Sequence, residues 1–369
     1  MKILQIINSL ATGGAEKFVV ELSNQLSNDH DVILCTVKPV ETQMILARNL
    51  QTSVQTVTLK CTKKYSLRLL CSLYSLINDI QPDVVHVHSS ILVFYIYLVS
   101  LCFRATLFVQ TIHNELTPAY RKLFRFLNCL RWLNRSFVHV CLSPSILNQF
   151  QSSFINLNFI QIYSGIVDLI PSENLNEVKK EVDRLKKSES TRLFLAAGNY
   201  SDFKNFMMLV ALFRELEAEG QDAILLLAGD AADVNRENFA TVAKFKSTHI
   251  HQLGLKTNVP DYLYCADALV ISSTMEGLPL IALEALSAGL PIITTPAGGM
   301  KDIVSDGVHG YIAEDFSKRA LLSKLEAFLS LDEDSIRRIR SSNRSLFSNQ
   351  FTIQLCAKKY IDLFQMKEL

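Results

Sequence analysis

Two glutamates, Glu276 and Glu284, stand eight residues apart in the segment SSTMEGLPLIALEALSAG. The apolar run 268–271 before them is typical of a buried strand, so Glu276 is expected in the loop that follows the strand. Glu284 is expected about two turns into the next helix, near the same strand end. Ligands of open α/β sheets bind at that edge. Because a carboxylate only accepts hydrogen bonds and can take a pair of O–H donors, the two glutamates predict a ligand rich in hydroxyls.

The whole pattern E-G-L-P-L-x-x-L-E-A-L-x-x-G-x-P resembles the signature of retaining glycosyltransferases of family 4, which have the GT-B fold. A capped helix with two solvated acids would explain the glutamates, but not the glycines and prolines among them. The resemblance implies transfer of a hexose-type sugar from a nucleotide diphosphate to a hydroxyl acceptor, with retained anomeric configuration. Glu276 would bind donor-sugar hydroxyls and Glu284 ribose hydroxyls. The matching donor-site positions also include Gly277, Leu278 and Pro279.

A second segment, AGNYSDFKN over 197–205, resembles the family's G-R-x-x-x-x-K. Gly198 is expected to end a strand and Lys204 to open the following helix. The resemblance implies that Gly198, Asn199 and Lys204 contact the donor diphosphate, whose leaving charge a lysine and helix N–H groups can stabilise without a metal. Asn199 stands where the family has arginine, so Lys204 would carry this role. As an exposed lysine it should contribute little to folding.

Two positions in the first half complete the site that the resemblance implies. Gly13 and Gly14, in NSLATGGAE, allow close approach of backbone N–H groups at a helix N-terminus, which favours anions. In the family this loop lies against the donor diphosphate and the acceptor. His113, in VQTIHN, matches the histidine near the hydroxyls of the transferred sugar; the alternative is a structural hydrogen bond at a strand end.

Other positions carry weaker predictions. Leu255 and Val259 fall in a segment that flanks the nucleotide base in the family, as does the loop at Gly229. The Gly298–Gly299 pair is expected at a helix entry near the donor. His86 and His88 share one face of a strand, but a metal would need a third ligand. A lining role for His88 and no metal site are therefore predicted, and the enzyme is expected to need no cofactor beyond its nucleotide sugar.

Strand and helix patterns alternate twice along the chain, which indicates two α/β halves with parallel sheets. Together with the resemblance, this predicts two Rossmann-like domains facing each other across a cleft. Residues 1–168 would form the acceptor-side domain and 190–350 the nucleotide-sugar-binding domain, with a polar connection between them. The final helix, within 351–369, is expected to pack back on the first domain. Seven strands are predicted before the connection and five after it.

Composition limits the partners and the compartment. The chain has 369 residues with a net charge of +1, which gives no general case for nucleic-acid binding. Its eight cysteines include no C-x-x-C pair, and burial is expected for those in apolar runs (Cys35, Cys102 and Cys141). Reduced thiols indicate a cytoplasmic protein. The start, MKILQII, is typical of a first strand rather than a signal peptide.

The helix predicted over 118–135 is amphipathic. Seven apolar residues are assigned to one face: Tyr120, Leu123, Phe124, Phe126, Leu127, Leu130 and Leu133. The other face carries Arg121, Lys122, Arg125 and Arg135, with Trp132 among them. This pattern fits a peripheral helix on an anionic membrane, where a lipid-linked glycan acceptor would lie, and equally a core helix with a solvated basic face.

Two other functions remain open at this stage. A sugar-nucleotide epimerase shares the double-Rossmann architecture and would convert the donor alone. A non-catalytic nucleotide-binding partner in a glycan assembly complex is favoured by the missing arginine at Asn199.

Overall fold

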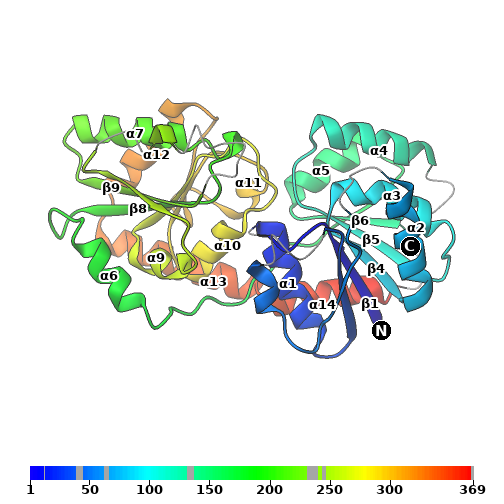
Figure 1. Cartoon of the computed structure of the whole chain (residues 1–369). Helices are drawn as coiled ribbons and strands as arrows, with labels where there is room; N and C mark the ends of the chain where they lie inside the picture. Colours follow the sequence, from blue (N-terminus) through cyan, green and yellow to red (C-terminus); the bar gives the residue numbers. More distant parts are fainter. Residues whose placement is uncertain are drawn as a thin grey trace. The chain divides into compact units, whose positions relative to one another are not determined.

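A computed structural model describes residues 1–11, 13–38, 45–61, 66–130, 137–230, 240–242 and 247–366 (Figure 1). The chain forms two compact units. The first unit is Met1–Val167 with Gln350–Leu369, and the second unit is Asp168–Asn349.

The first unit contains a seven-stranded parallel sheet in the order β3-β2-β1-β4-β5-β6-β7. Its strands are β1 Lys2–Ile7, β2 Asp31–Thr36, β3 Gln55–Thr58, β4 Val84–Val87, β5 Leu107–Ile112, β6 Phe137–Cys141 and β7 Asn158–Gln161. Its helices are α1 Gly14–Leu26, α2 Leu67–Ile80, α3 Ser90–Ser100, α4 Pro118–Leu130, α5 Pro144–Ser153 and α14 Ile353–Phe364, with a 3₁₀ turn at Ile45–Asn49.

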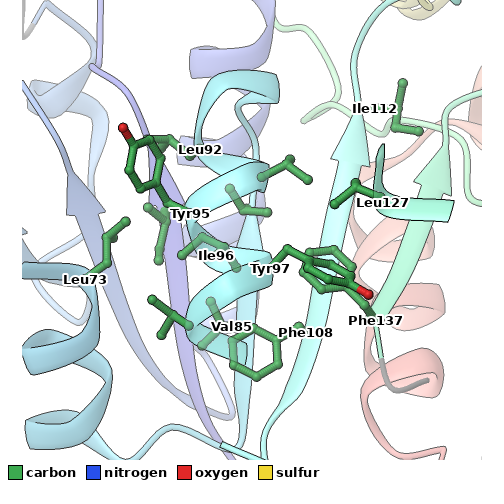
Figure 2. Packing of buried hydrophobic residues seen from close by; sticks show 14 of the residues in the cluster. Leu73, Val85, Leu92, Tyr95, Ile96, Tyr97, Phe108, Ile112, Leu127 and Phe137 are labelled. Atoms are coloured by element: carbon green, nitrogen blue, oxygen red, sulfur yellow. The ribbon is translucent and has the colours of Figure 1, made fainter. Parts of the chain in front are cut away.

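The two faces of this sheet differ in chemistry. On one face, strand residues such as Val85 and Phe108 pack with Leu73, Ile96 and Leu127 from α2, α3 and α4 in a hydrophobic core (Figure 2). The opposite face carries polar side chains on β1, β4 and β5 and lies under α1 and α14. Phe18 of α1 packs on His88, and Phe364 of α14 packs on His86. Because side chains alternate between the two faces of a sheet, every second residue of a strand points to this second face. On these three strands, some of those residues are polar.

The second unit contains a six-stranded parallel sheet in the order β10-β9-β8-β11-β12-β13. Its strands are β8 Arg192–Ala197, β9 Ala223–Ala228, β10 Ile250–Gly254, β11 Ala268–Ile271, β12 Ile292–Thr294 and β13 Gly310–Ile312. Its helices are α6 Leu175–Asp183, α7 Phe206–Ala218, α9 Val259–Cys265, α10 Leu280–Ser287, α11 Met300–Ile303, α12 Lys318–Leu329 and α13 Glu333–Gln350, with a 3₁₀ turn at Asp202–Lys204.

The predicted alternation of strands and helices is present in both units, with one strand missed. β13 has only three residues, Gly310–Ile312, too few for a periodic pattern. Helix α14 lies in the first unit, where it contacts α1. A parallel bridge pairs Ile166 with Thr352, and a Cβ on Gly165 would lie 2.5 Å from the Thr352 oxygen. The two chain segments therefore approach closely because residue 165 is a glycine.

Helix α4 corrects the predicted apolar face at one position. Tyr120, Phe124 and Leu127 are buried, whereas Phe126 is 44% exposed and its ring contacts Phe94 of α3. At about 100° per residue, position 126 lies more than half a turn from position 124, so the two cannot share a face. Arg121, Lys122 and Arg125 are exposed as expected. The side chains from residue 130 to Arg135, including Trp132 and Leu133, lie outside the described residues.

Two further findings bear on the sequence expectations. No helix in the described part of the chain is long and apolar enough to cross a membrane. Cys35 and Cys141 are buried as predicted, but Cys102 is exposed because it follows the end of α3 rather than continuing it.

Candidate active site

The central feature of the second unit is an ion pair at the carboxyl edge of its sheet. Lys204 Nζ lies 2.6 Å from Glu276 Oε1, and Ser273 Oγ donates to the same oxygen at 2.6 Å. Both charged side chains are partly buried, with 22% and 11% exposure. Lys204 follows β8 and Glu276 follows β11. The chain runs from β8 to β9 and β10 on one side before crossing to β11 on the other. This is the topological switch point, where ligands of such sheets bind.

Backbone contacts fix Lys204 in this place. Ser272 Oγ donates to the Lys204 carbonyl at 2.7 Å, and Thr274 N donates to the Phe203 carbonyl at 2.8 Å. Asn205 adopts a left-handed conformation (φ 52°) that separates the 3₁₀ turn from α7. Lys204 therefore ends a short turn bound to the β11 loop. The prediction that it opens the following helix was wrong, and so was the prediction that it is an exposed lysine, because its side chain is only 22% exposed.

Glycines bring the surrounding backbones into contact. A Cβ on Gly198 (φ 147°) would lie 3.3 Å from Lys204 Cε, so the lysine stem passes directly over this residue. A Cβ on Gly229, after β9, would lie 1.8 Å from the Gly198 oxygen. Asn199 is exposed at the same strand end. The segment thus keeps Lys204 against the sheet edge and leaves the side chain of Asn199 at the surface.

The loop that carries Glu276 rests on the glycine pair after β12. Gly299 N donates to the Gly277 oxygen at 2.8 Å, and a Cβ on Gly298 (φ 51°) would lie 2.1 Å from the Glu276 oxygen. Sequence analysis expected Gly298–Gly299 near the ligand. The structure shows a supporting contact that the sequence did not indicate, because the two loops are distant in the chain.

Glu284 lies on α10, which begins at Leu280, so it is little more than one turn into the helix rather than about two. It is buried, with 8% exposure. Gly277, Leu278 and Pro279, which connect the two glutamates, are buried as well. A buried turn therefore separates the two carboxylates along the chain.

The remaining predicted donor positions of this unit follow β10. Gly254 ends β10 and accepts a hydrogen bond from Gly229 N at 2.8 Å, so the loops after β9 and β10 adjoin. Leu255 is 55% exposed, and Val259 begins α9. A cavity of about 240 Å³ lies along 200–207, with Val242 in its wall, and includes none of the predicted donor residues.

In the first unit, the Gly13–Gly14 loop forms the N-terminus of α1. Gly13 is the N-cap, and its carbonyl accepts from Lys17 N at 3.0 Å. A Cβ on Gly13 would lie 2.2 Å from Glu16 Oε2, so the carboxyl of Glu16 folds back over the loop. Burial raises the pKa of Glu16. Sequence analysis did not single out Glu16, although a glutamate three residues after an N-cap often turns back in this way.

His113 follows β5 and contacts the polar face of the first sheet. Its Nε2 lies 3.3 Å from His88 Nδ1, and His88 Nε2 lies 2.7 Å from Gln5 Oε1. Burial lowers the pKa of His113 to about 4 and holds the pKa values of His86 and His88 well below the usual range. The histidines are therefore neutral at physiological pH. The structural hydrogen bond considered as an alternative for His113 is present.

Within the described ranges, no group of three or more His, Cys, Asp or Glu side chains is arranged to hold a metal ion. Metal independence stays a prediction.

Comparison with known proteins identifies the family. A family model described as "Glycosyltransferase Family 4" matches residues 12–166, and one described as "Glycosyl transferases group 1" matches residues 177–345. The chain belongs to glycosyltransferase family 4. The N-acetyl-alpha-D-glucosaminyl L-malate synthase of Bacillus anthracis is 25% identical over 316 residues, covering 81% of this chain and 79% of the relative.

A second relative of this family 4 enzyme is the UDP-Gal:alpha-D-GlcNAc-diphosphoundecaprenol alpha-1,3-galactosyltransferase of Escherichia coli, 24% identical with the same coverage. Among solved structures, Anabaena HepE in complex with UDP and glucose has a TM-score of 0.80 at 16% identity, covering 99% of this chain and 100% of that chain. The predicted α/β GT-B fold of two Rossmann-like halves is thus confirmed, and the chain is a glycosyltransferase.

Within each unit, the structure gathers the predicted residues of this glycosyltransferase at the carboxyl edge of a sheet. In the second unit, Lys204 and Glu276 are in direct contact. In the first unit, the Gly13–Gly14 loop follows β1 and His113 follows β5. The sequence did not indicate roles for Ser273 and Glu16. It also did not indicate that Gly298 supports the loop that carries Glu276.

Proposed function

We propose that this family 4 enzyme transfers a sugar from a uridine diphosphate sugar to a hydroxyl of a glycan or lipid-linked glycan, with retained anomeric configuration. The observation that carries the proposal is the Lys204–Glu276 pair at the switch point of the second sheet. The diphosphate of a nucleotide sugar can bind the Lys204 ammonium, and its sugar hydroxyls can donate to the Glu276 carboxylate. The ligand can therefore replace the ion pair that the two side chains form with each other. HepE was solved in complex with UDP, and the E. coli relative is named for the donor UDP-Gal.

The roles follow from the chemistry of each group. Lys204 would hold the diphosphate, and Glu276 would accept from the sugar hydroxyls while Ser273 keeps its carboxylate oriented. Glu284 would accept from the ribose hydroxyls. The first unit, with its Gly13–Gly14 loop and His113, would bind the acceptor and approach the donor sugar.

The reaction would proceed without a metal or an enzymatic nucleophile. The bond between the anomeric carbon and the phosphate oxygen breaks, while the acceptor oxygen bonds to the same face of that carbon. The acceptor proton passes to the leaving diphosphate, whose developing charge the Lys204 ammonium stabilises.

Binding of a panel of nucleotide sugars tests the donor. A donor present at about 100 times its Kd should raise the stability of the native state by roughly 2.7 kcal/mol, which thermal shift detects. Glu276→Gln should then lower kcat/KM by roughly ten- to a hundredfold, because charged hydrogen bonds contribute about 1.5–3 kcal/mol each. Glu284→Gln should mainly raise KM for the donor. Normal turnover by both variants would show that the donor site lies elsewhere.

Product analysis distinguishes transfer from the two functions that the sequence left open, neither of which membership of glycosyltransferase family 4 supports. An epimerase would convert the donor without acceptor. A non-catalytic partner, which the absence of arginine at Asn199 favours, would bind donor but release no nucleotide with any acceptor.

We also propose a cytoplasmic, membrane-peripheral location for this enzyme. Three exposed basic residues of α4 lie on the same helix as the exposed ring of Phe126, which contacts Phe94. The three are Arg121, Lys122 and Arg125. Cationic side chains beside exposed aromatic rings suit an anionic lipid surface.

Vesicle binding tests this location. Changing those three residues of α4 to glutamate should release the protein from vesicles rich in anionic lipid, since each basic residue contributes about 1 kcal/mol near such a surface. The matched control changes three exposed basic residues of the second unit to glutamate: Lys179, Lys180 and Arg184. Equal loss in both variants, or no binding by the unaltered protein at low salt, would refute the proposal.

A further inference from the structure

A chain of two hydrogen bonds in the first unit ends on His113. Gln5 Oε1 lies 2.7 Å from His88 Nε2, and His88 Nδ1 lies 3.3 Å from His113 Nε2. The three residues come from β1 and from the ends of β4 and β5, which are neighbours in the sheet. Sequence analysis gave His88 only a lining role. The hydrogen bonds show a directed connection instead.

The chemistry of the partners fixes the direction of this chain. Burial lowers the pKa values of His88 and His113, so each ring is neutral and carries one N–H. An amide oxygen only accepts, so the proton of His88 must be on Nε2. His88 Nδ1 is then an acceptor, and the proton of His113 must be on its Nε2. The remaining nitrogen of His113, Nδ1, is therefore left as a hydrogen-bond acceptor.

Two buried polar atoms of Gln5 and His86 take no part in this chain of hydrogen bonds. Gln5 and His86 are directly paired in the register of β1 and β4. Gln5 Nε2 and His86 Nδ1 are both buried without a hydrogen-bond partner among the described residues. His86 Nε2 lies 2.7 Å from Thr111 Oγ1 and can donate a hydrogen bond to it. In that tautomer, His86 Nδ1 carries no proton and has an unused lone pair. The position of the His88 proton therefore follows from the Gln5 oxygen, which lies 2.7 Å from His88 Nε2.

Packing holds the two rings in place. The ring of Phe18, from α1, lies edge-on to both His88 and His113, with centroid separations of 6.0 and 5.8 Å. On the far side of His86, Thr111 Oγ1 is 2.7 Å from the hydroxyl of Tyr360 on α14. The network is thus enclosed by α1 and α14, and neither ring can turn without breaking its hydrogen bonds.

We propose that Gln5 and His88 are positioning residues that hold His113 as the Nε2–H tautomer, so that His113 Nδ1 accepts a hydrogen bond from a hydroxyl of the donor sugar. This inference rests on the proposed function, in which His113 approaches that sugar. It adds a specificity rule: at this position the site recognises a hydroxyl as a donor, so a group that only accepts hydrogen bonds cannot replace it.

The tautomer can be measured on the ligand-free enzyme, independently of any activity. In protein labelled with ¹⁵N-histidine, we expect the proton on His113 Nε2 and a coupling across the hydrogen bond to His88 Nδ1. His88→Leu assigns the signals and should abolish the coupling. A proton on His113 Nδ1 in the unaltered protein, or on His88 Nδ1, would overturn the proposal.

Kinetics test the consequence for transfer. His88→Leu removes the acceptor that orients His113, and kcat/KM should fall roughly three- to tenfold, the worth of one neutral hydrogen bond. His88→Asn places an amide oxygen near the position of Nδ1 and should restore most of the loss. Equal loss in both variants, or no loss in His88→Leu, would contradict a positioning role.

Binding of UDP separates this proposal from the proposed function. UDP affinity, measured by calorimetry, should be the same in the unaltered protein and both His88 variants, because UDP lacks the sugar whose hydroxyl His113 would bind. If the unaltered protein binds no UDP, the donor assignment fails while the tautomer result still stands. If UDP affinity falls with His88→Leu alone, His88 acts on the nucleotide site and the proposal is wrong.

Discussion

Removing the ammonium of Lys204 should affect folding and catalysis separately, and the two effects can be told apart. In Lys204→Ala the Glu276 carboxylate, only 11% exposed, keeps the Ser273 hydroxyl but loses its cation. Exposed ion pairs contribute about 0–1 kcal/mol, whereas breaking a fully buried pair costs about 3–5 kcal/mol. A pair that is partly buried should lie between these limits. We expect the free energy of unfolding to fall by about 1–2 kcal/mol.

Catalysis should respond more strongly than folding. If Lys204 stabilises the leaving diphosphate, kcat should fall roughly 10²–10³-fold, as for the loss of one preorganised donor. The assays are denaturant unfolding and nucleotide release with the identified donor. A matched control is Lys318→Ala, since Lys318 pairs with Glu215 in the same unit at 47% and 35% exposure. It should change unfolding by less than about 1 kcal/mol and leave activity unaltered.

The double variant Lys204→Ala, Glu276→Gln decides between a structural and a catalytic lysine. Neutralising the carboxylate should restore much of the stability, because no uncompensated charge remains. Activity should not return, because the diphosphate still lacks its cation. Recovery in the double variant to the activity of Glu276→Gln alone would refute the reasoning and show that Lys204 only neutralises Glu276. An unchanged free energy of unfolding in the single variant would show that the ion pair does not persist in solution.

Three more predictions concern other residues of the two units. Asn199→Arg adds a guanidinium at the exposed end of β8 and should preserve or raise activity. It should also tighten UDP binding by roughly tenfold or more, as measured by calorimetry. Loss of activity in a folded variant would show that this strand end differs from the family pattern. Gly298→Ala should lower kcat/KM, because the added Cβ would displace the Glu276 loop. The control is Gly307→Ala, at a similar φ of 72°, where an added Cβ would meet no atom within 4 Å. It should lower the free energy of unfolding by about 1–2 kcal/mol without loss of activity. Because burial lowers the pKa of His113 to about 4, the unfolded state binds more protons than the native state between pH 4 and about 6.5, so the free energy of unfolding should decrease as pH falls through this window. His113→Phe should flatten that slope in pH-dependent unfolding, and an unchanged slope would mean that His113 does not titrate in this way.

The sequence by itself determined the local elements and the edge at which the site lies. The apolar run before Glu276 and the helix after Pro279 placed one carboxylate in a loop and the other on a helix. Such patterns are local, because strand and helix periodicities depend on neighbours only a few residues away. In a parallel sheet all strands end at the same edge, so Gly198 and Glu276 could be assigned to one side before any contact was known.

Local periodicity predicted the structure less well where a helix or strand is short or contacts another element. β13, with three residues, offered no pattern. Phe126 was assigned to the apolar face of its helix, but its angular position sets it beside Phe94 instead. Lys204 was taken for the start of a helix because the sequence does not show that Asn205 adopts a left-handed conformation there.

Only the tertiary structure decided which side chains meet. Lys204 and Glu276 are 72 residues apart and come together because β8 and β11 are adjacent in the sheet order. The hydroxyls of Thr111 and Tyr360 meet across 249 residues because α14 lies in the first unit. Sheet order and the return of a terminal helix depend on the packing of whole faces, and no short pattern encodes them. The sequence therefore indicated a hydroxyl-binding edge, and the packing of distant loops determined that the lysine and the glutamate at this edge are paired.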